Sequence, residues 1–339
     1  MDQSTDSRRS VQVSFGGPYI LTGAQEFLNP FMKCPEVSII VPIYNGSAYL
    51  SETLDSLVSQ TFSDFELLAI DDGSTDNSSK IVRSLGDERV RLIQKKNGGL
   101  CDTLNLGIAE AKAPFIARSD QDDISLPERL ERQMQVMSDH PQAIALFAYS
   151  TKFGRKHRWS NADKMVMAPG ELKEYEPMKD GSVLGSTMFA RTTALRSIGG
   201  FRSAYYPVDD WDLELRLVQT GTILIMREPM IAYRFHSSSN TYRLFADMCL
   251  KTRWAEDSYL RRQESLPELT LDQFELTQPR DAWTRLRRYR KDSSKLHMRT
   301  AGQRYLDGHY ISGAGHLITS VVLNPVNIVR RVKRYFGRS

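Results

Sequence analysis

Short apolar runs alternate with amphipathic segments between residues 37 and 117, and this alternation is the strongest constraint on the fold. Strands are predicted at residues 37–41, 66–70, 90–93 and 114–117, where β-branched and other apolar residues cluster. The segments between them repeat apolar residues at helical spacing, as in Leu50, Leu54 and Leu57, and Ser47 is the expected N-cap. Strands that alternate with helices of about 10–15 residues indicate βαβ units and an α/β fold whose parallel sheet is covered on both faces.

The sequence pattern divides the chain into three parts. Residues 1–35 show no clear periodicity and are expected to form an N-terminal arm or tail. Residues 36–240 carry the alternation, and residues 241–339 are expected to form a helical extension rich in arginine, glutamate and leucine. Further elements predicted in the second part are a helix from about residue 126, strands at 143–149 and 183–190, helices at 192–198 and 210–220, and strands at 222–226 and 230–235.

The composition is that of an ordinary globular protein, with 40% hydrophobic and 25% charged residues. The net charge of +4 is too small to indicate nucleic-acid binding, so no nucleic acid is expected as a partner. Residues 1–17 contain no apolar segment of a secretory signal, and no run of about 18 apolar residues occurs, so a cytoplasmic location is expected. The three cysteines lie far apart in the sequence, which suits a reducing compartment.

Polar side chains follow each of the four predicted strands. Ligands of open α/β sheets bind outside the carboxyl ends of the strands, where these side chains should converge. The candidates are Pro42, Tyr44 and Asn45 after the first strand, Asp71 and Asp72 after the second, Asn97 after the third, and Arg118, Asp120, Asp122 and Asp123 after the fourth. Carboxylates, an aromatic ring and amides at one sheet edge indicate a binding site and not a core.

Three carboxylates fall within four residues at Asp120, Asp122 and Asp123. Like charges this close repel each other, so a cation or hydrogen-bond donors should compensate them. Mg²⁺ and Mn²⁺ prefer oxygen ligands, and Mg²⁺ typically combines one or two carboxylates with substrate phosphates. The cluster therefore indicates a metal–diphosphate site, with a solvated turn and helix cap as the alternative. The phosphate-loop, dinucleotide-binding, zinc-protease and α/β-hydrolase motifs are absent from the sequence.

A series of short motifs resembles the family 2 glycosyltransferases. The matching segments are VSIIVPIYN at 37–45, LVSQTF at 57–62, IDDGSTD at 70–76, NGG at 97–99, ARSDQDD at 117–123, LPERL at 126–130, GGFR at 199–202, DDWDLELR at 209–216 and YRFH at 233–236. Each motif is unspecific by itself, but their order and spacing make the resemblance strong over about residues 37–240.

The resemblance implies a GT-A fold and a type of reaction. The fold is a Rossmann-like, mostly parallel mixed sheet flanked by helices, here with a nucleotide-binding half at 36–125, an acceptor half at 126–240 and the C-terminal helical extension. The reaction is inverting transfer of a sugar from a nucleotide diphosphate donor, usually with Mg²⁺ or Mn²⁺. Inversion is a single displacement, which needs a carboxylate base and positive charge at the leaving diphosphate but no covalent nucleophile.

The resemblance also implies roles for individual residues. Tyr44 would stack on the base with Pro42 shaping the pocket, Asp72 would bind the base, Asp120 or Asp122 would bind the ribose, and Asn45, Asn97 and Arg118 would complete the nucleotide site. Asp122 and Asp123 would hold the metal, and His236 would face the metal or the diphosphate. Asp210 would be the general base, with capping of its helix as the alternative. Many relatives have Glu-Asp where this chain has Asp209-Asp210, which leaves some ambiguity about the base.

These observations predict an inverting, metal-dependent glycosyltransferase that uses a nucleotide sugar, most reasonably a UDP-sugar, and a saccharide or lipid-linked acceptor. A sugar-phosphate nucleotidyltransferase is the first alternative, but its first loop should be glycine-rich and basic, whereas residues 42–46 are Pro-Ile-Tyr-Asn-Gly. A non-catalytic protein that binds nucleotide sugars is the second alternative, and the presence of all the expected acids argues against it. The sequence indicates no oligomeric state.

The C-terminal end contains a second candidate for binding. Asn324 and Pro325 form a favourable helix start, and residues 325–339 then combine an apolar face with several arginines and lysines. A short basic amphipathic helix of this kind is expected to lie on an anionic membrane surface, as a peripheral contact on the inner face of the membrane. The alternative is a helix that docks on the body of the protein with its basic face in water.

Overall fold

The computed structural model describes residues 34–154, 171–234 and 244–325. The described residues from Pro35 onward belong to one compact unit, and the description below concerns that unit. The predicted N-terminal arm and His236 therefore lie outside the described residues, as does nearly all of the predicted basic helix at 325–339.

The first half of the sheet confirms the four predicted strands. They are β1 (Val37–Ile43), β2 (Phe65–Asp71), β3 (Val90–Gln94) and β4 (Phe115–Arg118), parallel and in the spatial order β3-β2-β1-β4. The helices α1 (Leu50–Val58), α2 (Ser78–Ser84) and α3 (Leu100–Glu110) connect them. Ser47 is not the N-cap of α1, because its backbone N–H donates to Asp76 and the helix begins three residues later, after Tyr49.

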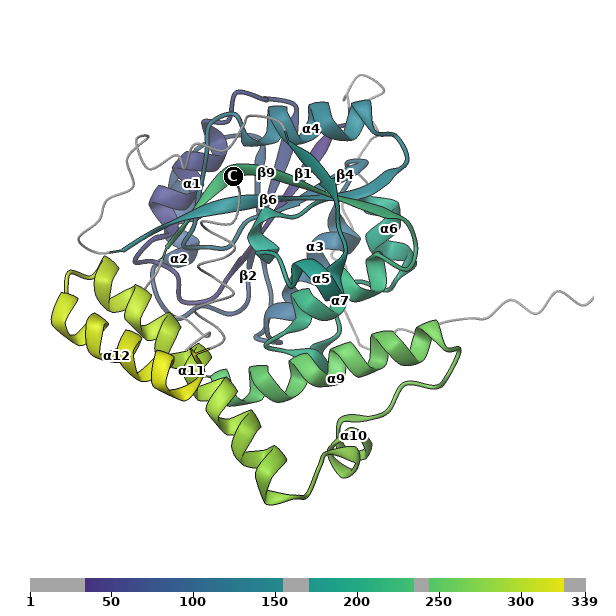
Figure 1. Ribbon diagram of the computed structural model, residues 1–339. Helices are drawn as coiled ribbons and strands as arrows, with labels where there is room; N and C mark the ends of the chain where they lie inside the picture. Colours follow the sequence, from purple (N-terminus) through teal and green to yellow (C-terminus); the bar gives the residue numbers. More distant parts are fainter. Residues whose placement is uncertain (1–33, 155–170, 235–243, 326–339) are drawn as a thin grey trace, which may run out of the picture. The chain divides into compact units, whose positions relative to one another are not determined.

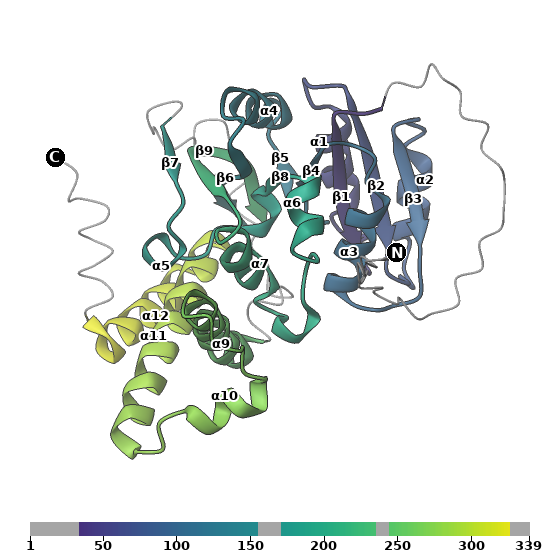
Figure 2. The ribbon, with the colours of Figure 1, turned by 90° about the vertical axis from the view of Figure 1, so that its right-hand side faces the viewer.

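The second half adds strands of both directions to the same sheet. Its elements are β5 (Ile124–Ser125), α4 (Arg129–Asp139), β6 (Ala143–Phe153), β7 (Leu172–Glu174), α5 (Pro177–Asp180), β8 (Phe189–Arg191), α6 (Thr192–Ser197), α7 (Asp209–Leu217) and β9 (Thr222–Arg234). The order continues β4-β8-β6-β9-β5, with β7 paired to β9. Figure 2 shows β3, β2, β1 and β4 in the right-hand part of the sheet and β6, β9 and β7 in the left-hand part. β8 is antiparallel to β4, which makes the sheet mixed.

Two predicted strands of the second half need correction. The strand expected at 183–190 is a 3₁₀ turn at Gly185–Thr187 followed by the short β8, because the hydroxyl of Thr187 bonds back to the Leu184 carbonyl. The two strands expected at 222–226 and 230–235 are one strand, β9. Pro229 does not end the strand. The register of β9 against β6 shifts around the pair Pro229 and Tyr149, because proline has no backbone N–H to donate to the neighbouring strand.

The core lies on both faces of the sheet. Alternate residues of β1 point to opposite sides, so Ile39 and Val41 pack with α1 and α4 while Ile40 packs with α3 and α7. Figure 1 shows α1 and α4 on the first of these faces. Both packed faces are apolar, which leaves the polar strand ends as the places where charged groups gather.

The C-terminal extension is helical, as expected. It contains α9 (Phe245–Gln263), α10 (Leu271–Thr277), α11 (Ala282–Leu306) and α12 (Tyr310–Leu323), which lie together in the lower part of Figures 1 and 2. α9 packs against α7, and Trp254 stacks on Tyr205 with ring centroids 3.9 Å apart. Asn324 ends α12 as its C-cap, so a helix that starts there stays a prediction. None of the helices in the described ranges is long and apolar enough to cross a membrane.

Candidate active site

The loop after β1 holds Tyr44 at the surface. Gln121 fixes its backbone from both sides, since Tyr44 N donates to Gln121 Oε1 at 2.9 Å and Gln121 Nε2 donates to the Tyr44 carbonyl at 3.2 Å. The Tyr44 side chain is 50% exposed, whereas Pro42 is buried inside β1 opposite Ile70. The arrangement presents an aromatic ring on a fixed backbone at the end of the strand.

Asn45 ties this loop to the one after β2. Its φ of 49° is left-handed, a conformation that Asn tolerates better than most residues. Its side-chain oxygen accepts a hydrogen bond from Thr75 N at 2.8 Å, and its own N–H donates to Ser74 Oγ at 3.0 Å. The Asn45 side chain is therefore engaged in joining two loops.

Asp72 organises the loop that follows β3. Its two carboxylate oxygens accept hydrogen bonds from Gly98 N at 2.8 Å and Gly99 N at 2.9 Å, and Lys95 Nζ lies 2.6 Å from Oδ1. Asn97 Nδ2 donates to the Asp72 carbonyl at 3.0 Å. Asp72 and Asn97 are thus brought together as predicted. The sequence interpretation missed Lys95, although its position just before Asn-Gly-Gly placed it at the same sheet edge.

Asp71 has a turn-forming role. Burial raises the pKa of its carboxyl, but hydrogen bonds from Ser74 and Ser79 outweigh that effect and hold the pKa below its usual value. Both carboxylate oxygens are used in this way, because Ser74 N and Ser79 Oγ donate to different ones. Asp71 consequently stays ionised inside the turn, and its neighbour Asp72 faces the next loop.

The three carboxylates of the acid loop after β4 differ in their exposure to solvent. Asp123 is fully buried, and its oxygens accept hydrogen bonds from Ser186 Oγ at 2.7 Å and Arg234 N at 3.1 Å. Burial, followed by the charges of Asp122 and Asp120, raises the pKa of Asp123 well above its usual value. Asp120 and Asp122 are partly exposed. The loop therefore turns two acids toward solvent and one into the protein.

Arg118 lies under this loop and is 95% buried. Its Nε donates to Asp120 Oδ1 at 2.9 Å. Its Nη1 makes no hydrogen bond to any described residue, and it lies 2.6 Å from the position that a Cβ on Gly185 would take. The same Cβ position is 3.3 Å from Cβ of Asp210. Gly185 thus allows the guanidinium and the start of α7 to lie next to each other.

Asp210 lies in the first turn of α7, with one side partly exposed. Its Oδ1 accepts a hydrogen bond from Trp211 N at 2.8 Å. Burial and then the charge of Asp209 raise the pKa of Asp210 to about 6, against the opposing effect of Arg118. Val208 occupies the N-cap position, so Asp210 is not the cap of this helix.

The neighbouring Asp209 is much less accessible. It is 96% buried and contacts the thiol of Cys101, and its Oδ2 has no hydrogen-bond partner among the described residues. Burial raises the pKa of its carboxyl, and Arg118 opposes that shift. Of the two acids at the start of α7, Asp210 is the one that solvent or a substrate can reach.

Two further acids of α7 were missed by sequence reasoning. Glu214, one turn after Asp210, is fully buried and accepts hydrogen bonds from the Tyr175 hydroxyl, Ser182 Oγ and Val183 N. Asp212 is buried between Arg202 and Arg216. The signal available was the density of acids in a helix whose other residues, apart from Arg216, are apolar. Trp211 is 95% buried and belongs to the core.

The residues predicted to bind a divalent cation differ in their accessibility. No three His, Cys, Asp or Glu side chains gather closely enough within them to hold a metal ion. Of the three residues predicted as ligands, Asp122 is partly exposed, Asp123 is buried, and His236 lies outside the described ranges. A site made from protein groups and substrate phosphates would need fewer side chains than such a cluster.

Comparisons with known proteins show which proteins this chain is similar to. The model of the family described as "Glycosyl transferase family 2" matches residues 38–199. A Bacillus subtilis protein described as "Putative glycosyltransferase EpsE" is 32% identical over 197 residues, which cover 55% of this chain and 68% of that protein. An "Uncharacterized glycosyltransferase" of Rickettsia felis is 29% identical over 217 residues, which cover 62% of this chain. The chain spans between about one third and two thirds of the length of its first curated relatives.

Solved structures support the fold. The crystal structure of Staphylococcus aureus TarS in complex with UDP-GlcNAc matches with a TM-score of 0.53 and 18% identity, over 86% of this chain and 90% of that one. TarS in complex with UDP matches with a TM-score of 0.51. At this level of identity the similarity concerns the fold, a mixed sheet flanked by helices with C-terminal helices added.

Proposed function

Because this chain belongs to glycosyl transferase family 2, we propose that it transfers a sugar from a nucleotide diphosphate sugar to an acceptor hydroxyl, with inversion at the anomeric carbon. We propose a UDP-sugar as the donor, since the structures of similar fold are complexes of TarS with UDP and UDP-GlcNAc. The proposed acceptor is a hydroxyl of a saccharide or of a lipid-linked saccharide.

One observation carries this proposal: Arg118 links the acids that follow β4 to Asp210 in the first turn of α7. It donates to Asp120 on one side, and on the other it lies against Gly185, which packs on Asp210. A donor bound at the strand ends and an acceptor hydroxyl at Asp210 would therefore meet at one place. Such proximity is the first requirement of a displacement between two substrates.

Asp210 is the proposed general base. Its carboxylate would accept the proton of the acceptor hydroxyl while the hydroxyl oxygen forms a bond to the anomeric carbon. The bond between that carbon and the diphosphate oxygen breaks at the same time, and the nucleoside diphosphate leaves with the electron pair. A pKa of about 6 leaves Asp210 ionised at neutral pH, yet more basic than an ordinary aspartate. Asp209 is buried and suits the role less well.

The proposed donor site lies at the ends of β1, β2 and β4. The exposed ring of Tyr44 would stack on the base above Pro42, since aromatic side chains stack on any base through its π-face. Asp72 is buried and its oxygens already accept hydrogen bonds from Gly98 and Gly99, so we propose that it presents the loop that it organises to the base. Asp120 would bind the ribose from the opposite side of the strand ends.

Mn²⁺ or Mg²⁺ would be held at the acid loop by the partly exposed carboxylate of Asp122. Asp122 together with diphosphate oxygens would satisfy the usual requirement for one or two carboxylates plus phosphates. A bound cation would supply positive charge for the departing diphosphate. We propose that Asp123 holds the loop in place, because Ser186 and Arg234 already occupy its oxygens. His236 stays a predicted contact.

Calorimetric titration tests the donor site. We expect one nucleoside diphosphate among UDP, GDP, dTDP and CDP to bind in the presence of Mn²⁺ and to bind more weakly in EDTA. Binding of UDP would support a UDP-sugar as the donor, whereas preference for another nucleotide would identify a different donor class. A protein that binds none of the four would contradict the donor site as a whole.

Turnover with Asp210→Asn separates an enzyme from a binding protein. We expect hydrolysis or transfer of the bound nucleotide sugar to fall at least about 100-fold, because removal of a general base typically costs that much or more. UDP affinity should stay within about twofold of the wild type. Within the ranges that the structure describes, no feature favours the nucleotidyltransferase alternative, and the loop after β1 contains no basic residue.

A further inference from the structure

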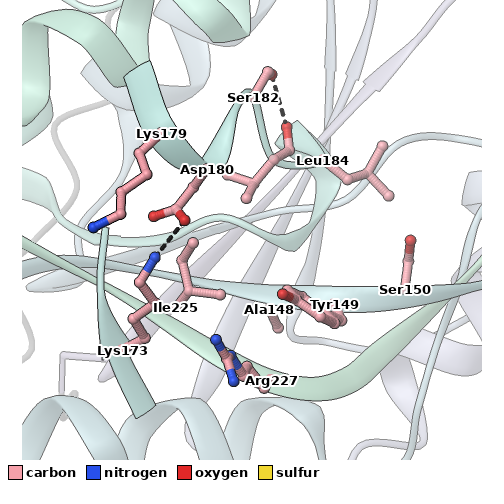
Figure 3. A pocket seen from close by; sticks show the side chains of 11 residues that line it. Ala148, Tyr149, Ser150, Lys173, Lys179, Asp180, Ser182, Leu184, Ile225 and Arg227 are labelled. Atoms are coloured by element: carbon pink, nitrogen blue, oxygen red, sulfur yellow. Dashed lines mark hydrogen bonds and ion pairs between the residues drawn. The ribbon is translucent and has the colours of Figure 1, made fainter. Parts of the chain in front are cut away.

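The half of the sheet that carries β6, β7 and β9 contains a pocket with a volume of about 500 Å³. Tyr149 of β6, Lys173 of β7, Lys179 and Asp180 of α5, and Arg227 of β9 contribute to its lining, as Figure 3 shows. None of these residues belongs to the proposed donor site. We call this feature the cationic pocket.

Positive charge dominates the lining of the cationic pocket. Lys173 forms an ion pair with Asp180, the one carboxylate among the lining residues, as drawn in Figure 3. The two remaining cations are Lys179 and Arg227, so the lining as a whole has an excess of two positive charges.

The partners of these two cations lie outside the lining. Lys179 pairs with Glu176 at 3.0 Å, and Arg227 pairs with Glu171 at 2.7 Å. Both glutamate side chains are more than half exposed, at 56% and 54%. The Lys179–Glu176 pair is exposed on both sides and contributes little net stabilisation, so an anion can replace Glu176 at small cost. Arg227 is more buried, and its guanidinium has several N–H donors that an anion can share with Glu171.

The wall of the cationic pocket continues directly to the proposed base. Ser182 and Val183 line the pocket, and both donate hydrogen bonds of 3.3 Å to Glu214, one turn after Asp210 on α7. The segment then reaches Gly185, which packs on Asp210 itself. A ligand in the pocket would therefore lie next to the segment that packs on the base.

We propose that the cationic pocket binds an anionic group of the acceptor, a phosphate or a carboxylate carried by the saccharide that receives the new sugar. This inference rests on the proposed function, because it makes the pocket a subsite for the acceptor. A volume of about 500 Å³ is in the range of small-molecule sites. The half-exposed ring of Tyr149 offers an apolar face to a sugar, and the cations offer charge-assisted hydrogen bonds to its acidic group.

The test compares acidic and neutral sugars as probes. Glucose 6-phosphate, glucuronate and glucose are titrated into the full chain by NMR, with and without saturating UDP and Mn²⁺ so that the donor site is occupied in one series. We expect both acidic sugars, or one of them, to bind while glucose does not, and the better of the two identifies the anion. The affinity should fall as salt is added, because screening weakens the attraction.

Two variants locate the binding. Lys179→Gln alters an exposed side chain and should fold normally, whereas Arg227→Gln removes the more buried cation. Each should weaken binding of the acidic sugar by about tenfold, the usual effect of losing one charge-assisted hydrogen bond. Lys112→Gln, at an exposed lysine outside the pocket, is the matched control and should change nothing.

The outcomes are distinct from those for the donor site. Equal binding of glucose and the acidic sugars, no binding of either acid, or equal losses in the Lys179 and Lys112 variants would each overturn this inference while leaving UDP binding intact. Absence of UDP binding in the same samples would instead contradict the proposed function. Loss of acidic-sugar binding confined to the Lys179 and Arg227 variants would support the cationic pocket.

Discussion

Gly185 and Arg118 are packed so closely that a methyl group at residue 185 would lie 2.6 Å from the Arg118 Nη1 atom. The guanidinium is buried and bonded to Asp120, so it has little freedom to withdraw. Asp210 lies on the other side of the same position, with 3.3 Å between its Cβ and the added methyl carbon. A side chain at residue 185 would therefore disturb both groups of acids at once.

Gly185→Ala is expected to lower turnover by at least about tenfold and the free energy of unfolding by about 1–3 kcal/mol, the usual cost of overpacking. Steady-state kinetics and urea unfolding measure the two effects. Gly302→Ala is the matched control, because a Cβ there meets open space inside α11 and should stabilise the protein by roughly 0.5–1 kcal/mol. Similar behaviour of the two variants would contradict the close packing at Gly185.

The pH dependence of kcat/KM should show the carboxyl of Asp210. Because its pKa is about 6 and only the ionised form accepts a proton, activity should fall as the pH drops below about 6. Asp209→Asn removes a negative charge that raises this pKa, so the acidic limb should move to lower pH. A limb that stays in place in this variant would show that another group controls the profile.

Tyr44 is suited to a clean test of base stacking, because its half-exposed ring contributes little to the core. Tyr44→Ala should weaken UDP binding by about 1–3 kcal/mol, the range measured for loss of a stacked aromatic ring. Tyr44→Phe keeps the ring and should bind UDP like the wild type. Calorimetry measures the UDP affinities of the wild type and the two variants. Equal affinities for all three would show that Tyr44 is not part of the donor site.

Sequence reasoning predicted the parallel half of the fold because its signals are local. The strands at 37–41 and 66–70 are apolar except at Ser38 and Glu66, as expected for a sheet covered on both faces. Topology then placed Asp72 and Asn97 together at one edge. Neighbouring parallel strands end at the same edge of the sheet, so the residues that follow them lie close together whatever their side-chain types.

The contacts that distinguish the acids from one another were not predictable. Ser186 reaches Asp123, 63 residues away, only because β8 inserts antiparallel beside β4. The sequence spacing contains no information on that insertion, and the segment around Ser186 resembled a strand. The same limit hid Glu214, whose partners come from a loop about 30 residues earlier. Burial of individual carboxylates depends on these long-range contacts.

Asp122 and Asp123 should respond differently to the same substitution. Asp122→Asn should abolish most of the Mn²⁺-dependent part of UDP affinity, because a neutral amide is a poor ligand for a hard cation. Asp123→Asn should keep the Mn²⁺ dependence and lower the free energy of unfolding by about 1–3 kcal/mol, since an amide N–H would face the donors Ser186 and Arg234. Loss of Mn²⁺ dependence in the Asp123 variant would show that Asp123 is itself a metal ligand.

A pair of histidines should make the C-terminal helices sensitive to acid. His297 of α11 and His316 of α12 share a hydrogen bond of 2.8 Å between their Nδ1 atoms, which requires one of the two nitrogens to carry no proton. Burial, and then the charge of His297, lowers the pKa of His316 below its usual value of 6.5. A lowered pKa means that the folded state disfavours the proton, so stability is present above about pH 6.5 and is lost as the pH falls.

The free energy of unfolding should therefore decrease between pH 7.5 and pH 5.5 by about 0.5–1 kcal/mol more in the wild type than in His316→Gln, a small effect because both rings are partly in solvent. Urea unfolding at the two pH values measures the difference, and subtraction of the variant removes the contribution of all other titrating groups. His140→Gln, at a histidine outside α11 and α12, should retain the full decrease. An identical decrease in the wild type and His316→Gln would mean that the pair contributes nothing to the acid sensitivity of the fold.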